Sequence, residues 1–400
     1  MTSGLDGMLP LMWISRMTAM LLHAEMNAIA LPDGIQRGLR PARLPRSDTF
    51  LARYESRILF YDVYWSADGR QIILQGPPPV DLGPQYHDAR YICQPSGQTV
   101  KARAHHSSVV QLYSLDAPPG TTHVDIVFAG HTQRVAVGAN HAGFFAGTNL
   151  LFTLSKDNDL AWIADWARFH VVNQGVDAVL LFDNMSTRYS VAELETALLG
   201  VEGLKRIAVV PVPFTYPLED RAVPEHIFWA HFLQPAVIVT MLRRYGMATE
   251  GILNCDIDEL AVPLAPQTVF EAANRSRSGT VYFRGCWIEP VPDSAQPGPY
   301  RHVDFTQVEA SIDVRRGPTN KWALTPRRRW LQDLKIHPYA HVIENRPMLT
   351  RHKPGTAFIA HFKAISNGWK YDRTVVSQAA VPLKRQPELV AALARAFAQR

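Results

Sequence analysis

The chain has 400 residues, of which 47% are hydrophobic and 19% charged, and its net charge is +5. This composition excludes disordered and fibrous proteins and suits two globular domains of roughly 100–200 residues each. Cys93, Cys255 and Cys286 lie far apart, without a CxxC pair or a histidine at zinc-finger spacing. They indicate neither a disulfide framework nor a structural zinc site, and they favour a reducing, cytoplasmic compartment.

The first 50 residues are predicted to form an N-terminal extension. Residues 8–22 are apolar, but Arg16 interrupts them and the run is shorter than the about 20 apolar residues that span a bilayer. We expect an amphipathic segment or a non-native start here, in preference to a surface anchor. No later stretch is long and apolar enough to cross a membrane.

Residues 51–147 alternate short apolar runs with turns that contain glycine or proline. RILFYDVYW, QIILQ, SVVQLYSL and HVDIVFA are such runs, and no long helical pattern separates them. Spacing of this kind is typical of antiparallel β-sandwiches. We predict a β-rich accessory domain without chemistry of its own.

From residue 148 the pattern changes to alternating strands and helices. Strands are predicted at 149–156, 176–184, 204–212 and 251–260, and helices at 160–174, 190–200 and 226–246, the last interrupted by Pro235. Nearly continuous apolar strands joined by helices indicate a parallel sheet that is covered on both faces. Ligands bind outside the carboxyl ends of the strands in such sheets.

The rest of the chain continues this domain to residue 375 and ends in a helix. Further strands are expected at 281–290, 317–326, 334–343 and 355–366, and the terminal helix, from Glu388, lies within 376–400. The predicted fold class is therefore α/β: a Rossmann-like, mostly parallel sheet at 148–375 that follows a β-sandwich-like domain.

Three polar clusters follow three of the predicted parallel strands. They are Ser155-Lys156-Asp157-Asn158, Asp183-Asn184-Met185-Ser186-Thr187 and Asp256-Ile257-Asp258-Glu259. Because carboxyl ends of parallel strands meet at one edge of a sheet, we expect the clusters to lie together. The absence of GxGxxG, GxxxxGK[ST] and GxSxG argues against a nicotinamide dehydrogenase, a P-loop enzyme and an α/β-hydrolase.

Asp256 and Asp258 form an Asp-x-Asp pattern at the end of a buried strand. In an extended segment both carboxylates point to one side, while Ile257 points to the core. Hard carboxylate oxygens favour Mg²⁺ or Mn²⁺, which can neutralise a departing diphosphate. A second copy, Asp157-Asn158-Asp159, precedes an apolar helix, and we interpret Asp159 as its N-cap.

Further short motifs follow in a fixed order along residues 148–373. They are Asp165-Trp166, Gly175-Val176-Asp177, Lys321-Trp322, His337-Pro338 and His361-Phe362. Together with SKDND, LLFDNMS and DIDEL, this order resembles the GT-A glycosyltransferases of family 92 and the related family 2 groups. The resemblance implies a GT-A fold with a DxD metal motif.

The resemblance also implies roles for individual residues. Nucleotide-binding residues would be Ser155, Lys156, Asp157, Asp183, Asn184 and Lys321, with Asp183 accepting a hydrogen bond from the base, commonly uracil. Asp256, Asp258 and His361 would hold Mn²⁺ or Mg²⁺ against the diphosphate. Arg327, Arg328 and Arg329 are further candidates for phosphate contact by charge.

Inverting sugar transfer needs a base that deprotonates the acceptor hydroxyl. Glu289, in the loop after the apolar strand VYFRGCWI, is the first candidate, and Glu259 and Asp304 follow it. His337 and His341 fit neither strand alternation nor a metal-binding helix, and we interpret them as structural. Alternatives stay open at single positions: Asp183 to Ser186 can be a simple capped turn, and His361 a core residue.

The predicted function is metal-dependent, inverting transfer of a sugar from a nucleotide diphosphate, UDP in particular, to a saccharide or lipid-linked saccharide, in surface polysaccharide or glycoconjugate synthesis. From residue 315 onward the chain has 17 Lys and Arg against four Asp and Glu, which predicts an anionic partner or a solvated basic face. We expect peripheral contact with the inner face of a membrane there, and no nucleic acid. The alternatives are a catalytically inactive carbohydrate- or membrane-binding protein and a metal-dependent nucleotidyltransferase or phosphohydrolase.

Overall fold

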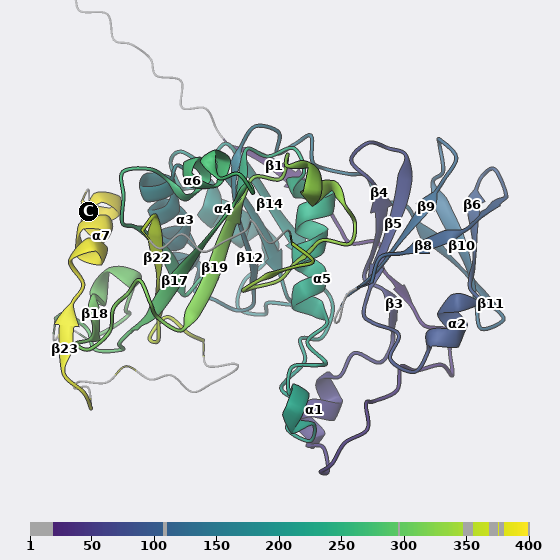
Figure 1. Cartoon of the computed structure of the whole chain (residues 1–400), viewed down its shortest axis with the longest axis horizontal. Helices are drawn as coiled ribbons and strands as arrows, with labels where there is room; N and C mark the ends of the chain where they lie inside the picture. The colour runs from purple at the N-terminus through teal and green to yellow at the C-terminus, as the bar shows by residue number, and fades with distance from the viewer. Residues whose placement is uncertain are drawn as a thin grey trace, which may run out of the picture.

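The computed structural model describes residues 19–106, 110–294, 297–346, 355–367, 375 and 380–398. This part of the chain is mixed α/β (Figure 1). A nine-stranded sheet with helices on its faces lies beside two four-stranded antiparallel sheets.

The large sheet has the order β1-β14-β13-β12-β15-β19-β17-β22-β16. Its strands are β1 (Met20–His23), β14 (Arg206–Pro211), β13 (Ala178–Asp183), β12 (Asn149–Ser155), β15 (Gly251–Asn254), β19 (Thr319–Leu324), β17 (Thr280–Ile288), β22 (Ala357–Phe362) and β16 (Glu259–Pro263). The first five run parallel, whereas β19 is antiparallel to β15 and β16 is antiparallel to β22. The predicted α/β class with a largely parallel sheet is confirmed.

The segment predicted as an N-terminal extension contributes a strand to this sheet. Met20–His23, at the end of the apolar run, pairs in parallel with β14 as strand β1, with Leu21 opposite Ile207. The run forms a strand here because it adds to an existing sheet edge, which sequence alone does not reveal. Residues 8–18 of the predicted amphipathic segment lie outside the described residues.

Helices cover both faces of the large sheet. α3 (Leu160–Gln174), α4 (Val191–Leu199), α6 (Val269–Arg275) and α7 (Pro387–Phe397) share one core with alternate strand residues, and α5 (Leu233–Thr240) packs on the other face. The side chain of Asp159 accepts from the Ala161 N–H at 2.8 Å, which confirms it as the N-cap of α3. No helix in the described ranges is long and apolar enough to cross a membrane.

The long helix predicted at 226–246 is wrong in its first part. α5 begins at Leu233, and a π-helical segment η2 (Met241–Gly246) continues it, whereas η1 (Pro224–His226) and turns precede it. Pro235 therefore lies in the first turn of α5, where a missing N–H costs nothing because no helical partner exists there. The proline stands near the start of the helix and does not interrupt it.

The strand predicted at 334–343 is also wrong. Only β20 (His337–Pro338) and β21 (Ile343–Glu344) pair, across a short turn. The remaining elements of this region are the pair β18 (Gln307–Glu309) and β23 (Leu383–Arg385), with η3 (His302–Asp304) and η4 (Arg329–Gln332). Residues 334–343 contain apolar positions because Ile336 and Ile343 are buried against the large sheet. These positions do not form a continuous strand.

The antiparallel pairing predicted for residues 51–147 is observed. One sheet is formed by β4 (Asp62–Trp65), β5 (Gln71–Gly76), β9 (Gln111–Asp116) and β8 (Ala102–Ala104), and the other by β11 (His131–Ala136), β10 (His123–Phe128), β6 (Arg90–Gln94) and β7 (Gln98–Val100). Both sheets contribute to one apolar core. β2 (Ile29–Ala30) with β3 (Ile58–Phe60), α1 (Asp48–Arg53) and α2 (Gly83–His87) complete this part of the chain.

Two buried polar side chains of α3 fasten the helix to β16 and α6. The Nε2 atom of His170 accepts from the Ala261 N–H at 3.1 Å, and its Nδ1–H donates to the Trp166 carbonyl at 2.8 Å. Gln174 donates to the Ala261 carbonyl at 2.7 Å and accepts from the Val269 N–H at 3.0 Å. Since Nε2 accepts a backbone hydrogen bond, the imidazole is held neutral.

We expect His170 to make the fold sensitive to acid. Burial lowers its pKa from 6.5 to about 3. The unfolded imidazole binds a proton below pH 6.5 and the folded one does not, so this group alone should reduce the free energy of unfolding by about 2 kcal/mol between pH 7 and pH 5. Urea unfolding at both pH values should show a loss about 2 kcal/mol smaller for His170→Asn, which cannot titrate. An equal loss in both proteins would contradict this.

Candidate active site

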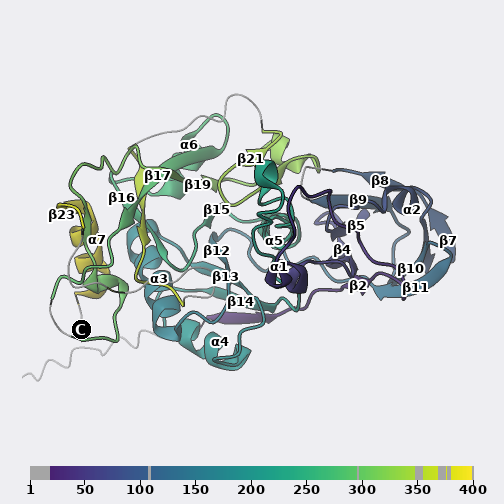
Figure 2. The same cartoon turned by 90° about the horizontal axis from the view of Figure 1, so that it is seen from below.

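The three polar clusters meet at one edge of the large sheet. Ser155 ends β12 opposite Asp183 at the end of β13, and β15 lies on the other side of β12. In Figure 2, strands β13, β12, β15 and β19 follow one another across the sheet. A cavity of about 260 Å³ opens at this edge.

Seven of the predicted site residues line this cavity. They are Ser155, Lys156, Asn184, Asp256, Asp258, Glu259 and His361. They come from four separate elements or the turns behind them, β12, β13, β15–β16 and β22. The structure therefore brings together the residues that the sequence placed more than 200 positions apart.

Two predicted nucleotide-binding residues, Asp157 and Asp183, do not line the cavity. Asp183 accepts from the hydroxyl of Ser186 at 2.6 Å, and burial raises the pKa of its carboxyl group. Asp157 accepts from the backbone N–H groups of Thr187 and Arg188 at 2.6 and 3.1 Å. Both carboxylates hold the loop after β13, and their roles toward a nucleotide stay predictions.

Lys156 and Asn184 are held in place by neighbouring backbone. The ammonium of Lys156 donates to the carbonyls of Asn184 and Met185 at 3.1 and 2.8 Å. The amide of Asn184 donates to the carbonyls of Val212 and Phe214 at 3.0 and 2.7 Å. These bonds fix one positive charge on the cavity wall.

Asp256 and Asp258 lie in a tight turn, not in the extended segment predicted at 251–260. β15 ends at Asn254, the Glu259 N–H donates to the Asp256 carbonyl at 3.0 Å, and β16 then starts in the opposite sense. Ile257 is 3% exposed and packs in the core, as predicted. The turn forms because Glu259 pairs with His361 on β22, which a reading of local alternation cannot foresee.

Lys321 lies beneath the carboxylates and does not line the cavity. Its ammonium is 2.8 Å from Asp256 Oδ2 and 2.9 Å from Glu259 Oε2, and its side chain is fully buried. Burial disfavours the charged form, but the two carboxylates outweigh this and raise the pKa of Lys321. The lysine is therefore a fixed cation that holds both carboxylates.

His361 faces Asp258 on one side and Glu259 on the other. Its Nε2 is 3.0 Å from Asp258 Oδ2, and its Nδ1 is 3.6 Å from Glu259 Oε1. Burial disfavours the imidazolium, but Asp258, Glu259 and Asp256 together outweigh burial and raise the pKa of His361. The ring of Trp287 lies 4.0 Å from the imidazole centroid. Because metal-bound histidines commonly donate their second N–H to a carboxylate, Glu259 is well placed to orient His361.

The donor chemistry of this wall fits a divalent ion. Asp256, Asp258 and His361 are 34%, 22% and 14% exposed, and carboxylate and imidazole donors suit Mn²⁺. Within the described ranges, no three His, Cys, Asp or Glu residues are already grouped around one point that could hold a metal ion. Asp256 instead contacts Lys321 and Asp258 contacts His361, so an ion would have to replace these contacts.

Two of the three predicted bases lie away from the cavity. Glu289 receives two hydrogen bonds from Lys363, at 2.7 and 2.8 Å, and Asp304 accepts from the Arg301 N–H at 2.7 Å. Neither residue lines the cavity. Glu259 does, but its side chain is 1% exposed and is bonded to Lys321.

Arg327 and Arg328 also point elsewhere. Arg327 pairs with Glu250, and the Arg328 guanidinium donates to the carbonyls of Asn274 and Ser276 at 2.6 and 3.1 Å. Of the basic C-terminal third, residues 347–354, 368–374, 376–379 and 399–400 lie outside the described residues. Peripheral membrane contact through that region stays a prediction.

Sequence reasoning missed several residues of the cavity wall. The wall also contains Tyr216, Gln234, His341, Ser366 and Asn367, so the interpretation of His341 as a structural residue is wrong. These residues come from loops and from the start of α5, where no periodic pattern marks a position as facing a site. By contrast, His337 is fully buried and bonded to the His105 carbonyl, as expected of a structural residue.

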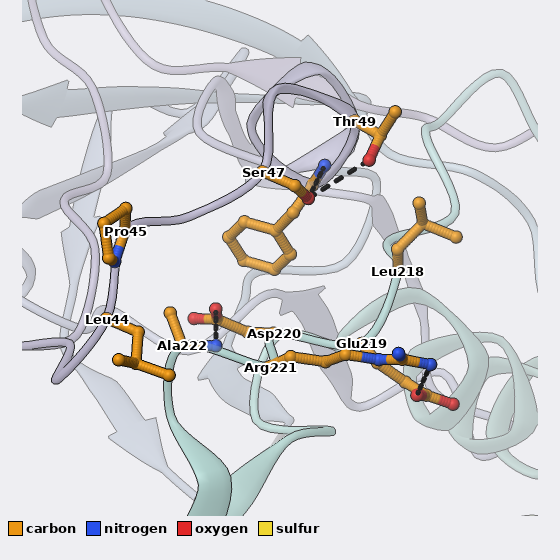
Figure 3. A pocket seen from close by; sticks show the side chains of 10 residues that line it. Leu44, Pro45, Ser47, Thr49, Leu218, Glu219, Asp220, Arg221 and Ala222 are labelled. Atoms are coloured by element: carbon orange, nitrogen blue, oxygen red, sulfur yellow. Dashed lines mark hydrogen bonds and ion pairs between the residues drawn. The ribbon is translucent and has the colours of Figure 1, made fainter.

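A larger cavity, of about 450 Å³, lies between α1 and residues 218–222 (Figure 3). Its buried carboxylate, Asp220, accepts from Arg46 at 2.9 Å, from the Trp229 indole at 2.8 Å and from the Ala222 N–H at 3.2 Å. These bonds give Asp220 a structural role. No predicted site residue lines this cavity, so the chemistry points to the smaller one.

Similarity between this chain and known proteins is limited. No protein-family model and no curated protein matches the chain. Among solved structures, it is similar to core-mannan synthase A from Aspergillus fumigatus in an Mn/GDP form, at 10% identity and a TM-score of 0.25. The match covers 36% of this chain and 44% of that one, less than half of either. A likeness at this TM-score carries no weight for fold or activity.

Proposed function

We propose that this protein is a metal-dependent glycosyltransferase of the GT-A type. It would move a sugar from a nucleotide diphosphate, UDP in the first instance, to a hydroxyl of a saccharide or lipid-linked saccharide. The observation that carries the proposal is the cavity of about 260 Å³ at the carboxyl ends of β12, β13 and β15, with Asp256, Asp258 and His361 on its wall. The motif order that resembles glycosyltransferase family 92 supports it.

The residues of the cavity divide by position. Ser155, Lys156 and Asn184 lie on the β12–β13 side and would bind the nucleotide, with the fixed ammonium of Lys156 placed for a phosphate. Asp256, Asp258 and His361 would hold Mn²⁺ or Mg²⁺, and such an ion supplies positive charge to a departing diphosphate. The buried Lys321 keeps Asp256 and Glu259 in position from below.

The reaction is an inverting displacement at the anomeric carbon. The acceptor oxygen forms a bond to that carbon as the bond to the diphosphate breaks, and a base takes the proton of the acceptor hydroxyl. Exclusion of water from a site of this size would favour transfer over hydrolysis.

UDP together with Mn²⁺ is expected to raise the melting temperature. A ligand that binds only the folded protein adds about 2.7 kcal/mol to the free energy of unfolding at about 100 times its Kd. Thermal unfolding should be followed with UDP and Mn²⁺, with UDP and EDTA, and with GDP and Mn²⁺. We expect EDTA to remove most of the stabilisation. No shift with either nucleotide diphosphate would contradict the proposal.

Product analysis separates this activity from the related ones. A panel of UDP-glucose, UDP-galactose, UDP-N-acetylglucosamine and GDP-mannose should be incubated with protein and Mn²⁺. A glycosyltransferase releases the nucleoside diphosphate and the free sugar when water is the acceptor. Release of nucleoside monophosphate or pyrophosphate would identify a phosphohydrolase or nucleotidyltransferase.

A further inference from the structure

His341 lies on the wall of the candidate active site in a defined orientation. Its Nδ1–H donates to the backbone carbonyl of Asn320 at 2.8 Å, and the side-chain amide of Asn320 donates to the His341 carbonyl at 2.8 Å. A neutral imidazole that donates through Nδ1 has its lone pair on Nε2. In the described residues, Nε2 has no hydrogen-bond partner, and the side chain is exposed to the cavity.

The position of His341 follows from the strand order. Ser155 ends β12 and Asn184 follows β13, the carboxylates follow β15, and Asn320 lies on β19, the next strand across the sheet (Figure 2). Lys321, beside Asn320, contacts Asp256. The amide of Asn254, at the end of β15, donates to the Ala340 carbonyl at 3.0 Å. His341 therefore lies on the β19 side of the cavity and shares its wall with Asp256 and Asp258.

Under the proposed function, a nucleotide over β12 and β13 with its diphosphate at Asp256 and Asp258 would direct its sugar toward β19, the strand next to β15. The acceptor would then meet the sugar on that side of the cavity. The carboxylates predicted as the base do not serve this position, since Glu289 and Asp304 lie elsewhere and Glu259 is buried against Lys321. Of the two histidines on the wall, His361 is already bonded to Asp258.

We propose that His341 is the general base of the transfer, an inference that rests on the proposed function. Its Nε2 takes the proton of the acceptor hydroxyl as the oxygen bonds to the anomeric carbon. The bond from that carbon to the diphosphate breaks, and its electron pair leaves with the nucleotide. The imidazolium that results keeps its Nδ1–H on the Asn320 carbonyl, which stabilises the positive charge.

The test uses Mn²⁺-dependent hydrolysis of whichever panel sugar nucleotide the wild-type protein cleaves fastest. Water is then the acceptor and needs the same base. For His341→Gln we expect a kcat lower by about 10²- to 10⁴-fold, because a general base contributes that much. The KM for the donor and the stabilisation by UDP and Mn²⁺ should stay unchanged. Exposed His226, on η1, gives the matched control: His226→Gln should behave as wild type.

A second variant distinguishes a general base from a side chain that only shapes the cavity wall. His341→Ala leaves space at the wall, and added imidazole should restore part of its lost kcat. Full kcat in His341→Gln would overturn the inference and leave the proposed function standing. Loss of the stabilisation by UDP and Mn²⁺ in that variant would also overturn it, because His341 would then be a donor-binding residue. If the wild-type protein cleaves no sugar nucleotide of the panel, the proposed function fails and this inference fails with it.

Discussion

Replacement of Asp256 or Asp258 by asparagine is expected to lower Mn²⁺-dependent donor hydrolysis on the order of 10³-fold, because under the proposed function each change would remove a charged ligand of an ion that would stabilise the departing diphosphate by several kcal/mol. The fold should stay intact. Asp256 is 34% exposed, and Glu259 keeps its pairing with Lys321, so the free energy of unfolding should change by about 1 kcal/mol or less. Initial rates with saturating Mn²⁺ and thermal unfolding measure the two effects.

The second Asp-x-Asp pattern offers a matched control. Asp159 only caps α3, and asparagine is an equally good N-cap, so Asp159→Asn should leave hydrolysis and stability unchanged. Undiminished hydrolysis in either Asp256→Asn or Asp258→Asn, or full activity in EDTA, would refute the metal role of this turn.

Loss of the Asp62 carboxylate should destabilise the fold strongly. Asp62, on β4, receives bonds of 3.1 and 2.8 Å from Arg244, on η2, and a bond of 2.9 Å from the Asn27 N–H. The two charged side chains are 0% and 3% exposed. Asp62→Ala leaves a buried guanidinium without its counter-charge, so the free energy of unfolding should fall by about 3–5 kcal/mol.

An exposed pair in the same sheet gives the comparison. Asp116 and Arg103 are 63% and 55% exposed and lie 2.6 Å apart, so Asp116→Ala should cost about 0–1 kcal/mol. Urea unfolding of both variants measures the difference. Equal losses would show that the Asp62–Arg244 contact does not hold the antiparallel sheets to the large sheet.

Much of the large sheet was predictable because its signals are local. The apolar runs of β12, β13 and β14 are buried on both faces, and such strands keep their character whatever their neighbours are. Gly175 ends α3 with a φ of +70°, a conformation that glycine adopts without strain. Parallel topology then places the strand ends, and the polar residues behind them, at one edge.

The turn at Asp256 shows where local reasoning fails. Alternation predicted one strand over 251–260, but the chain reverses after Asn254 and continues as β16. β16 exists because β22, about a hundred residues later, offers it an antiparallel partner. A partner so distant in sequence leaves no trace in local periodicity.

The sequence by itself determined the α/β class, the strand ends at which the polar clusters meet, and the carboxylates and histidine on the cavity wall. Only the tertiary structure decided that Lys321 is buried under Asp256 and Glu259, that Glu289 and Asp304 lie elsewhere, and that His341 faces the cavity. The physical reason is that burial and charge pairing depend on neighbours in space. Residue type and periodicity report only the position of a residue within its own element.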